Sequence, residues 1–350
     1  MRIGLYGLPS AGKTHVLEKI DFINVFLGST CLKKLDPEFD VRSEEEKNKV
    51  RETLAMLLSK KDNFIMDGHY AFGNKKVFTE KDGMLYDIFL YLYINPDILQ
   101  KRMAQSEKNR KYLAYNIKKW QWDEIENLRV YCHKYNKDFY VLDNPPNYDF
   151  RDIEEIIQFL KTITAGFSCV NYARKCASEI LNKETEMVIT LTDGDKTITV
   201  EDSSHVVFCY KTNLFDGNFY TGFQAWKQGE AFRKFTKQSQ NPRLVSINKR
   251  IIEKLQEPIY VLTSGHSEIW RKISEYLHLK YYSGNQMSAD TKFFITKFLQ
   301  EAGKKVICYG DGMNDYYMLK QADKGYLVRK RDGSISQSLK DRDLGGIQIV

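Results

Sequence analysis

The sequence lacks the features that mark secreted, membrane-spanning and zinc-binding proteins. Its six cysteines are scattered and include no C-x-x-C pair, and no basic-then-apolar leader opens the chain. No apolar run reaches the roughly 18 to 20 residues that a membrane span needs. The six histidines are dispersed, and none has the i, i+4 spacing of a helical zinc pair. We therefore expect a cytoplasmic, reduced protein with no membrane partner.

Internal repeats and low-complexity tracts are also missing, so ordinary globular domains are expected. With 350 residues, of which 42% are hydrophobic and 28% charged, the chain is long enough for two domains with proper cores. The net charge of +7 is modest for this length and does not by itself indicate nucleic-acid binding. Residues 108–122 interleave cations with aromatics, which suits either nucleic-acid binding or an ATP lid followed by an amphipathic helix.

The strongest chemical signal is a pair of carboxylates, Asp193 and Asp195, at the end of the apolar run V-I-T-L-T. A lone D-x-D is usually a polar turn, but a second strand pattern ends far downstream in G-D-G-M-N-D, which contains Asp311 and Asp315. Asp193 is the expected nucleophile, and Asp195 is the expected general acid and base. Because these carboxylates repel an anionic phosphate, we expect the four to bind Mg²⁺.

Two further segments fall between these carboxylates in the chain. The strand pattern P-I-Y-V-L-T ends at Ser264 and Gly265, whose hydroxyl and backbone can hydrogen-bond a phosphoryl oxygen. A helical pattern then carries Lys292, whose charge can offset that of a pentacoordinate transition state. A lysine in isolation would be an ordinary surface residue, but in this order Lys292 is predicted to clamp phosphate.

Together these segments resemble the four motifs of the haloacid dehalogenase superfamily, and their wording is most similar to the phosphoserine phosphatase branch. The resemblance covers roughly residues 186–350. It implies a Rossmann-like fold with a helical cap inserted at about residues 199–257, and hydrolysis of a phosphomonoester. It also implies a set of contacts to the substrate phosphate: Thr197, Ser264, Gly265, Lys292 and Asn314. The chain departs from the family pattern at Lys196 and His266.

An independent motif, G-x-x-x-x-G-K-T, spans Gly7 to Thr14 between a short apolar strand and a helical pattern. Gly7 and Gly12 let backbone amides wrap phosphate oxygens, Lys13 reaches the outer phosphates, and Thr14 ligates Mg²⁺. This region is therefore predicted to bind ATP or another nucleoside triphosphate.

The following segments resemble the small P-loop kinases of the adenylate, gluconate and polynucleotide kinase group. Asp67 ends a strand and is expected near Mg²⁺ or the phosphoryl acceptor, while Arg102 and Arg110 suit a lid that closes on the triphosphate. Asp36 either orients the acceptor or belongs to an ordinary turn with helix-cap chemistry. His69 and His266 each follow a motif glycine, where a substrate contact and a structural role are both open.

Alternation of strand and helix patterns on both sides predicts an α/β protein with two doubly wound parallel sheets. We expect a P-loop kinase-like domain at 1–165, a helical linker at 166–185 and a phosphatase domain at 186–350.

Three functions remain open from the sequence. The leading hypothesis is a bifunctional enzyme that phosphorylates a hydroxyl and removes a phosphate at nucleic-acid ends, because the domain order resembles phage-type polynucleotide kinase/phosphatase. Alternatives are a metabolite or nucleotide kinase fused to a phosphoserine phosphatase-like hydrolase, and a phosphatase regulated by a nucleotide-sensing P-loop domain. The sequence does not indicate an oligomeric state.

Overall fold

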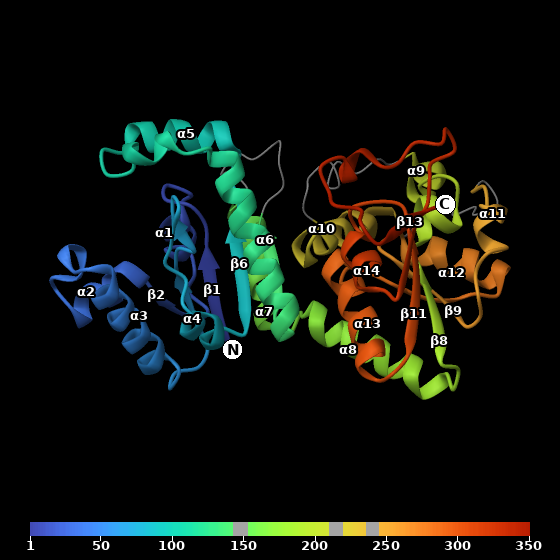
Figure 1. Ribbon diagram of the computed structural model, residues 1–350, viewed down its shortest axis with the longest axis horizontal. Coiled ribbons are helices and arrows are strands. Elements are labelled where there is room, and N and C mark those ends of the chain that lie inside the picture. The colour runs from blue at the N-terminus through green and yellow to red at the C-terminus, as the bar shows by residue number, and fades with distance from the viewer. Residues whose placement is uncertain (143–152, 210–219, 236–244) are drawn as a thin grey trace. The chain divides into compact units, whose positions relative to one another are not determined.

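The computed structural model describes residues 1–142, 153–209, 220–235 and 245–350. The chain forms two compact units, Met1–Phe167 and Ser168–Val350, each built on its own parallel sheet (Figure 1). Both units alternate strands with helices, which confirms the predicted α/β class. Among the described residues, no helix combines the length and apolar character that a bilayer crossing requires.

The sheet of the first unit has five parallel strands in the order β2-β3-β1-β6-β7. They are β1 (Arg2–Tyr6), β2 (Asn24–Phe26), β3 (Phe64–Asp67), β6 (Ile88–Leu92) and β7 (Asp138–Leu142). Every residue of β6, I-F-L-Y-L, is buried, as expected for a central strand that helices cover on both faces. From β1 the chain continues to β2 and β3 on one side of the sheet and then to β6 and β7 on the other side. Such a change of direction leaves a crevice at the carboxyl end of β1, where the P-loop begins.

In the described part of this unit, the α-helices beside the sheet are α1 (Lys13–Leu17), α2 (Gly28–Leu35), α3 (Glu44–Leu58), α4 (Glu80–Leu85), α5 (Pro96–Gln105), α6 (Ile117–Tyr135) and α7 (Ile153–Thr164). Local sequence signals set their ends. Ser43 and Glu46 form a reciprocal capping box at the start of α3, and α6 ends at Asn136 in the left-handed conformation. A short hairpin, β4 (Ala71–Phe72) and β5 (Lys75–Lys76), follows β3.

The sheet of the second unit has six parallel strands in the order β10-β9-β8-β11-β12-β13. They are β8 (Val188–Thr192), β9 (Ile259–Thr263), β10 (Lys280–Ser283), β11 (Lys305–Gly310), β12 (Lys324–Leu327) and β13 (Ile347–Ile349). Side chains of β9 alternate between two apolar clusters, with Tyr260 and Leu262 in one and Val261 in the other. The sheet is therefore covered on both faces.

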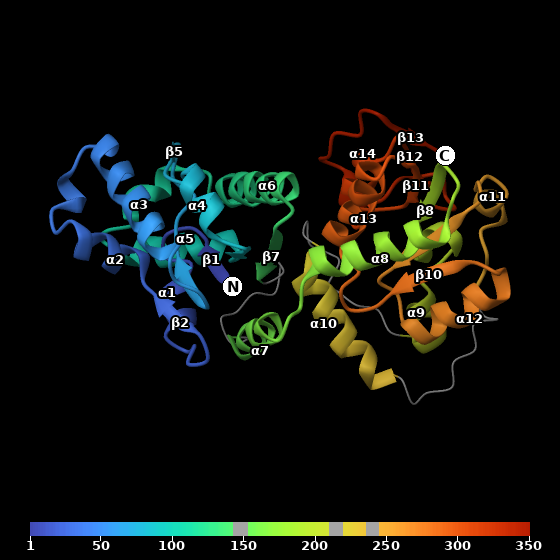
Figure 2. The same ribbon diagram turned by 90° about the horizontal axis from the view of Figure 1, so that it is seen from below.

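The helices of this unit are α8 (Cys169–Lys183), α9 (Ser203–Phe208), α10 (Gly222–Phe232), α11 (Lys249–Ile252), α12 (Ser267–Leu277), α13 (Ala289–Glu301) and α14 (Tyr316–Gln321). Helix α8 falls in the segment predicted as a linker, yet it packs along α13 within the second unit (Figure 2). Its apolar face, which includes Ala173, Ala177 and Ile180, joins the main core cluster of the unit. The helical pattern at 169–183 is thus part of a compact unit.

The insert expected to form a cap, at about 199–257, contains α9, α10 and α11 among its described residues. Residues 210–219 and 236–244 of this insert lie outside the described part of the chain. Helix α10 packs against α13, and Tyr220 just before it is buried. This insert therefore contributes helices beside the ends of β8 and β9, as a cap would.

Candidate active sites

The first site is a cavity of about 420 Å³ in the second unit, at the carboxyl ends of β8, β9 and β11. From β8 the chain continues to β9 on one side of the sheet and later to β11 on the other side, so the topological switch point lies beside β8. Doubly wound sheets bind ligands at this point. The cavity brings together residues that are up to 122 positions apart in the sequence: Asp193, Asp195, Ser264, Asp311, Asn314 and Asp315.

Lys292, on α13, has its ammonium group beneath this cavity between two carboxylates. Its Nζ donates to Asp193 Oδ1 at 2.5 Å and to Asp315 Oδ1 at 2.7 Å. The side chain is completely buried. Burial lowers the pKa of Lys292, but the attraction of Asp193 and Asp315 is larger in sum and raises it above its ordinary value. Lys292 therefore stays charged and fixes the orientation of Asp193.

Three carboxylates form a group that could hold a metal ion: Asp193, Asp311 and Asp315. Each offers an oxygen atom, and these atoms lie within 4.8 Å of one another. Burial, followed by repulsion from Asp315, raises the pKa of Asp193 well above its ordinary value and that of Asp311 to about 7. Such a set of hard oxygen donors with more negative charge than Lys292 neutralises fits Mg²⁺.

Asp195 lies on the cavity wall but outside this group of three. Its Oδ1 accepts from the backbone N–H of Ser203 at 2.8 Å, and its Oδ2 accepts from Trp270 Nε1 at 3.4 Å. Burial, followed by repulsion from Asp202, raises the pKa of Asp195 to about 6. A carboxyl group with this pKa can both donate and accept a proton near neutral pH, as the predicted acid and base requires.

The turn between Asp193 and Asp195 depends on close packing against Trp270, which is fully buried on α12. A Cβ added to Gly194 or to Gly265 would lie 2.4 Å from an atom of the Trp270 indole ring. Both glycines are therefore required for this close approach. Lys196 follows in the left-handed conformation, φ 63°, which is where the chain departs from the family pattern.

The residues predicted to contact phosphate fall into two groups. Ser264 and Asn314 line the cavity, and Asn314 Nδ2 donates to Ser264 Oγ at 3.2 Å. Thr197 is completely buried with an unpartnered Oγ1, and the backbone N–H of Gly265 donates to Thr263 Oγ1 at 3.0 Å. Thr197, Gly265 and Lys292 are not among the residues that line the cavity, and Lys292 reaches it only through its bonds to Asp193 and Asp315.

Several lining residues carry no motif and were missed from the sequence: Tyr220, Gln228, Lys330, Ser336, Gln337 and Ser338. Tyr220 and Gln228 come from the insert, where the phenol donates to Gln228 Oε1 at 2.6 Å. The segment 330–338 lies between β12 and β13, and Ser338 Oγ accepts from the backbone N–H of Met313 at 3.1 Å. No local sequence signal places this segment beside the G-D-G-M-N-D turn.

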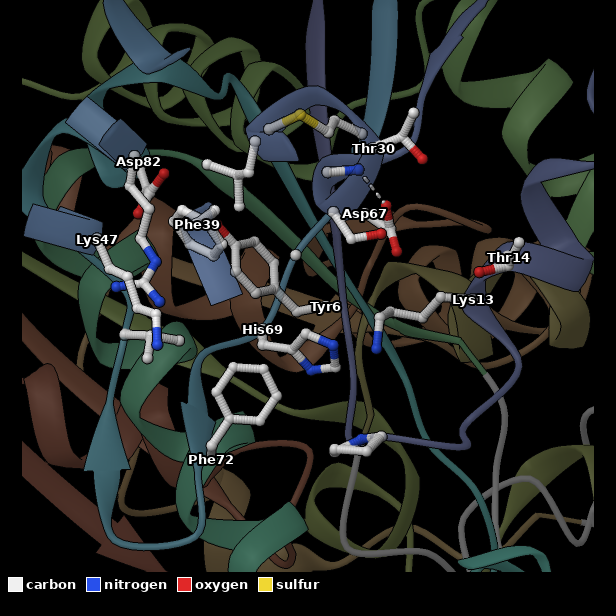
Figure 3. A pocket seen from close by; sticks show the side chains of 18 of the residues that line it. Tyr6, Lys13, Thr14, Thr30, Phe39, Lys47, Asp67, His69, Phe72 and Asp82 are labelled. Carbon is white, nitrogen blue, oxygen red and sulfur yellow. Dashed lines mark hydrogen bonds between the residues drawn. The ribbon is translucent and has the colours of Figure 1, made fainter. Parts of the chain in front are cut away.

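The second site is a cavity of about 890 Å³ in the first unit, beside the P-loop (Figure 3). Lys13 and Thr14 line it at the start of α1. Lys13 Nζ donates to the carbonyl oxygens of Gly7 at 2.6 Å and Leu8 at 3.2 Å. Burial lowers the pKa of Lys13 to about 8. The loop turns through Gly12, φ 94°, so a residue that tolerates the left-handed region is needed there.

Asp67, at the end of β3, lies near Lys13 and Thr30 in this cavity (Figure 3). Its Oδ1 accepts from the backbone N–H of Gly28 at 2.7 Å, which ties β3 to the start of α2. A Cβ added to Gly28 would lie 2.4 Å from the carbonyl oxygen of Asp67. The carboxylate of Asp67 is therefore held in the cavity beside the P-loop lysine.

Four other predicted residues are not among those that line this cavity: Gly7, Asp36, Arg102 and Arg110. Asp36 accepts from Arg42 Nε at 2.8 Å and from the backbone N–H of Glu38 at 3.0 Å, so it closes a local turn. Arg110 donates to the carbonyl oxygen of Ala104, and Arg102 lies in the last turn of α5. The predicted lid segment still reaches the cavity, through Lys108, Asn109, Lys111 and Tyr112.

The two histidines next to motif glycines differ in position. His69 is half-buried in the P-loop cavity, its ring packs on Phe72 at 4.5 Å between centroids, and its enclosed position lowers its pKa well below the ordinary value. His266 is buried against Phe208 and Phe232 of the insert and does not line the cavity of the second unit. His69 is thus placed to contact a ligand, and His266 packs against the insert.

Comparisons of sequence give no relatives, because no protein-family model and no curated protein matches the chain. Solved structures do match. Shikimate kinase from Bacteroides thetaiotaomicron is 17% identical and matches over 47% of this chain and 98% of its own, with a TM-score of 0.34. A phosphoserine phosphatase in its apo form is 15% identical and matches over 47% of this chain and 94% of its own, with a TM-score of 0.30.

A third structure, a HAD family hydrolase from Salmonella enterica subsp. enterica serovar Typhi, is 13% identical. It matches over 51% of this chain and 76% of its own, with a TM-score of 0.31. Kinase and phosphatase structures are thus both among the neighbours, each over about half of the chain.

Proposed function

We propose that the second unit is a Mg²⁺-dependent phosphomonoester hydrolase that works through a phosphoaspartate at Asp193. The observation that carries this proposal is the buried ammonium group of Lys292, which bonds both Asp193 and Asp315. If Lys292 served only to stabilise the fold, the third carboxylate, Asp311, and the open cavity beside Asp193 and Asp315 would have no purpose. Nucleophilic attack on a phosphate requires charge compensation of this kind.

The chemistry follows from the positions of two carboxyl groups. A carboxylate oxygen of Asp193 attacks phosphorus, the bond from phosphorus to the ester oxygen breaks, and the Asp195 carboxyl gives its proton to the leaving alkoxide. Asp195 then takes a proton from water as the water oxygen attacks phosphorus, which frees inorganic phosphate and restores Asp193. When bound by Asp193, Asp311 and Asp315, the divalent cation neutralises charge between these carboxylates and the phosphoryl oxygens.

We further propose that the first unit transfers the γ-phosphoryl group of ATP to a hydroxyl. The P-loop motif supports this role, because Lys13 is buried, lines the cavity and belongs to the G-x-x-x-x-G-K-T sequence whose lysine reaches the outer phosphates of a nucleotide. The acceptor oxygen attacks the γ-phosphorus, the bond to the bridging oxygen breaks and ADP leaves. Asp67, held beside Lys13 by Gly28, accepts the hydroxyl proton.

Nucleic-acid ends are the leading substrates under this proposal. Lysines and aromatic rings line the P-loop cavity together, because Lys108 and Lys111 share it with Tyr112, Phe39 and Phe72, and the Tyr112 ring stacks on Phe72 at 6.1 Å between centroids. A nucleic-acid end with a hydroxyl to be phosphorylated and a phosphate to be removed would be a substrate for both activities. A small metabolite as acceptor is the competing outcome of the experiment.

The test incubates the full chain with Mg²⁺, γ-labelled ATP and a panel of 5′-hydroxyl oligonucleotides, nucleosides and sugars. We expect label on the oligonucleotide ends, and Lys13→Ala should remove that label while hydrolysis of an aryl phosphate continues. Label on a small acceptor alone would favour a metabolite kinase. ATP binding without transfer to any acceptor would reject the kinase proposal and favour a nucleotide sensor.

A further inference from the structure

One face of α3 forms part of the P-loop cavity. Glu44, Lys47 and Arg51 are spaced by three and four residues, so they share this face, and all three line the cavity with Phe39 and Lys75. In Figure 3, Lys47 and Phe39 lie on the opposite side of the cavity from Lys13 and Thr14, with His69 between them. We call Lys47, Arg51, Lys75, Glu44 and Phe39 the α3 subsite.

A single carboxylate of the α3 subsite faces three cations. Glu44 lies 2.9 Å from Lys75 Nζ, 3.5 Å from Lys47 Nζ and 3.7 Å from an Arg51 nitrogen. The half-buried carboxyl of Asp82 also lines this end of the cavity near Arg51. Even with both carboxylates ionised, the three cations leave a surplus of positive charge.

The two inner cations have little water around them. The exposed fraction is 17% for the Lys47 side chain and 12% for the Arg51 side chain. The Arg51 guanidinium lies 5.5 Å from the centroid of the Phe39 ring, and Lys47 Nζ lies 5.9 Å from it. Arg51 Nη1 donates to Asn48 Oδ1 at 2.6 Å, and this bond together with the contact to the ring orients the guanidinium, so that its other donors can serve an oxyanion.

The P-loop cavity as a whole also has more positive than negative side chains. Seven lysine and arginine side chains line it, against four aspartate and glutamate side chains. Lys13 is assigned to ATP in the proposed function, and Lys33 forms an ion pair with Asp40 at 2.6 Å. The remaining cations lie on α3, the β4-β5 hairpin and the 106–115 segment, so the surplus surrounds the space next to the P-loop.

We propose that the α3 subsite binds an anionic group of the phosphoryl acceptor, so that the acceptor is an anion that also carries the reactive hydroxyl. This inference rests on the proposed kinase function of the first unit. A phosphate or a carboxylate would receive charge-assisted hydrogen bonds from Arg51 and Lys47. A neutral alcohol or sugar would leave the half-buried cations without a partner of opposite charge beyond Glu44 and Asp82, and it would bind more weakly.

The test measures equilibrium binding by calorimetry, without any transfer step, for matched pairs of acceptors. One pair is a nucleoside and the same nucleoside with a 3′-phosphate, and the other is a neutral sugar and its carboxylate. In the wild type we expect the anionic member of at least one pair to bind about tenfold more tightly or better. The pair that shows the difference identifies whether phosphate or carboxylate is recognised.

Variants on one helix provide the comparison. Arg51→Met and, separately, Lys47→Met should erase most of the preference for the anion, with unchanged affinity for ATP and an unchanged melting temperature. Lys49→Met is the matched control, because Lys49 lies on α3, pairs with Glu45 at 2.8 Å and does not line the cavity. It should keep the preference.

Equal binding of both members of each pair by the wild type, or no binding of either anion, would overturn the subsite. A preference that survives in both Arg51→Met and Lys47→Met would overturn it as well. Failure of the proposed kinase function looks different, since the wild type would then bind the anion yet transfer no phosphate from ATP.

Discussion

In the second unit a lysine lies buried between two carboxylates, whereas in the first unit the P-loop lysine donates to carbonyl oxygens of its own loop. Both sites lie at the carboxyl ends of parallel strands. In the second unit, carboxylates of the protein itself supply the charge opposite Lys292. The wall of the P-loop cavity carries more lysine and arginine side chains than aspartate and glutamate side chains. Under the proposed functions, the two sites thus differ in whether protein or substrate supplies the opposing charge.

The largest effects are expected when one reactive group is removed from each unit, which tests whether the two sites act separately. Asp193→Asn should lower hydrolysis of an aryl phosphate by about 10⁴-fold or more, because no nucleophile remains. Lys13→Ala should lower phosphoryl transfer by about 10² to 10³-fold, because charge on the outer phosphates is no longer offset. Both rates are measured on both variants with Mg²⁺. Each variant should keep the activity of the other unit, and joint loss would contradict two separate sites.

A second test concerns the buried lysine itself. Lys292→Met leaves Asp193 and Asp315 without their shared cation, and we expect the free energy of unfolding at neutral pH to fall by about 3–5 kcal/mol. Because the pKa of Asp193 is raised, protonation relieves this repulsion, and the loss should shrink as the pH falls. Denaturant melts at several pH values measure it.

Lys297→Met is the control for that experiment, because Lys297 lies on the same helix in an ion pair with Glu301 at 3.8 Å. Its loss should cost less than about 1 kcal/mol. A similar loss in both variants would show that the position on α13, and not the charge, matters.

Metal affinity should depend on pH in the second unit. Mg²⁺ requires ionised carboxylates, and the pKa of Asp311 is about 7 in the protein without metal. Below that value a proton must leave before the cation binds, so the apparent Kd for Mg²⁺ should rise by up to about tenfold for each pH unit below 7. Calorimetric titrations from pH 5.5 to 8.5 measure this. In Asp311→Asn the affinity should be weaker and its pH dependence shallower, and an unchanged slope would exclude Asp311 as the titrating ligand.

The smallest expected effect comes from the indole that holds Asp195. The N–H of Trp270 stabilises the ionised carboxylate, so Trp270→Phe should raise the pKa of Asp195, about 6 in the wild type. The fall of phosphatase activity on the alkaline side should then shift upward by less than about one pH unit. The pH profile of kcat/KM measures it, with Trp122→Phe in the first unit as the control. A downward shift would contradict the assignment of Asp195 as the proton donor.

The fold class and much of the geometry of the site in the second unit could be predicted from the sequence, because each motif lies where a strand ends. The carboxyl ends of parallel strands meet at one edge of a sheet, so Asp193, Ser264 and Asp311 converge once the strands are recognised. Asp36 and Arg110 were less predictable, since local hydrogen bonds compete with a role in the cavity. Arg51, which lines the P-loop cavity, carries no motif at all.

The sequence by itself determined which groups can perform chemistry: the carboxylates of D-G-D, the lysine of α13 and the P-loop. Strand patterns and motif spacing are local properties, so they can be read without knowing the packing. Only the tertiary structure decided which surfaces surround those groups. Long-range packing places 330–338 beside the phosphatase cavity and the cationic face of α3 beside the P-loop. These two placements depend on contacts between side chains that are far apart in the sequence, and motif spacing does not predict such contacts.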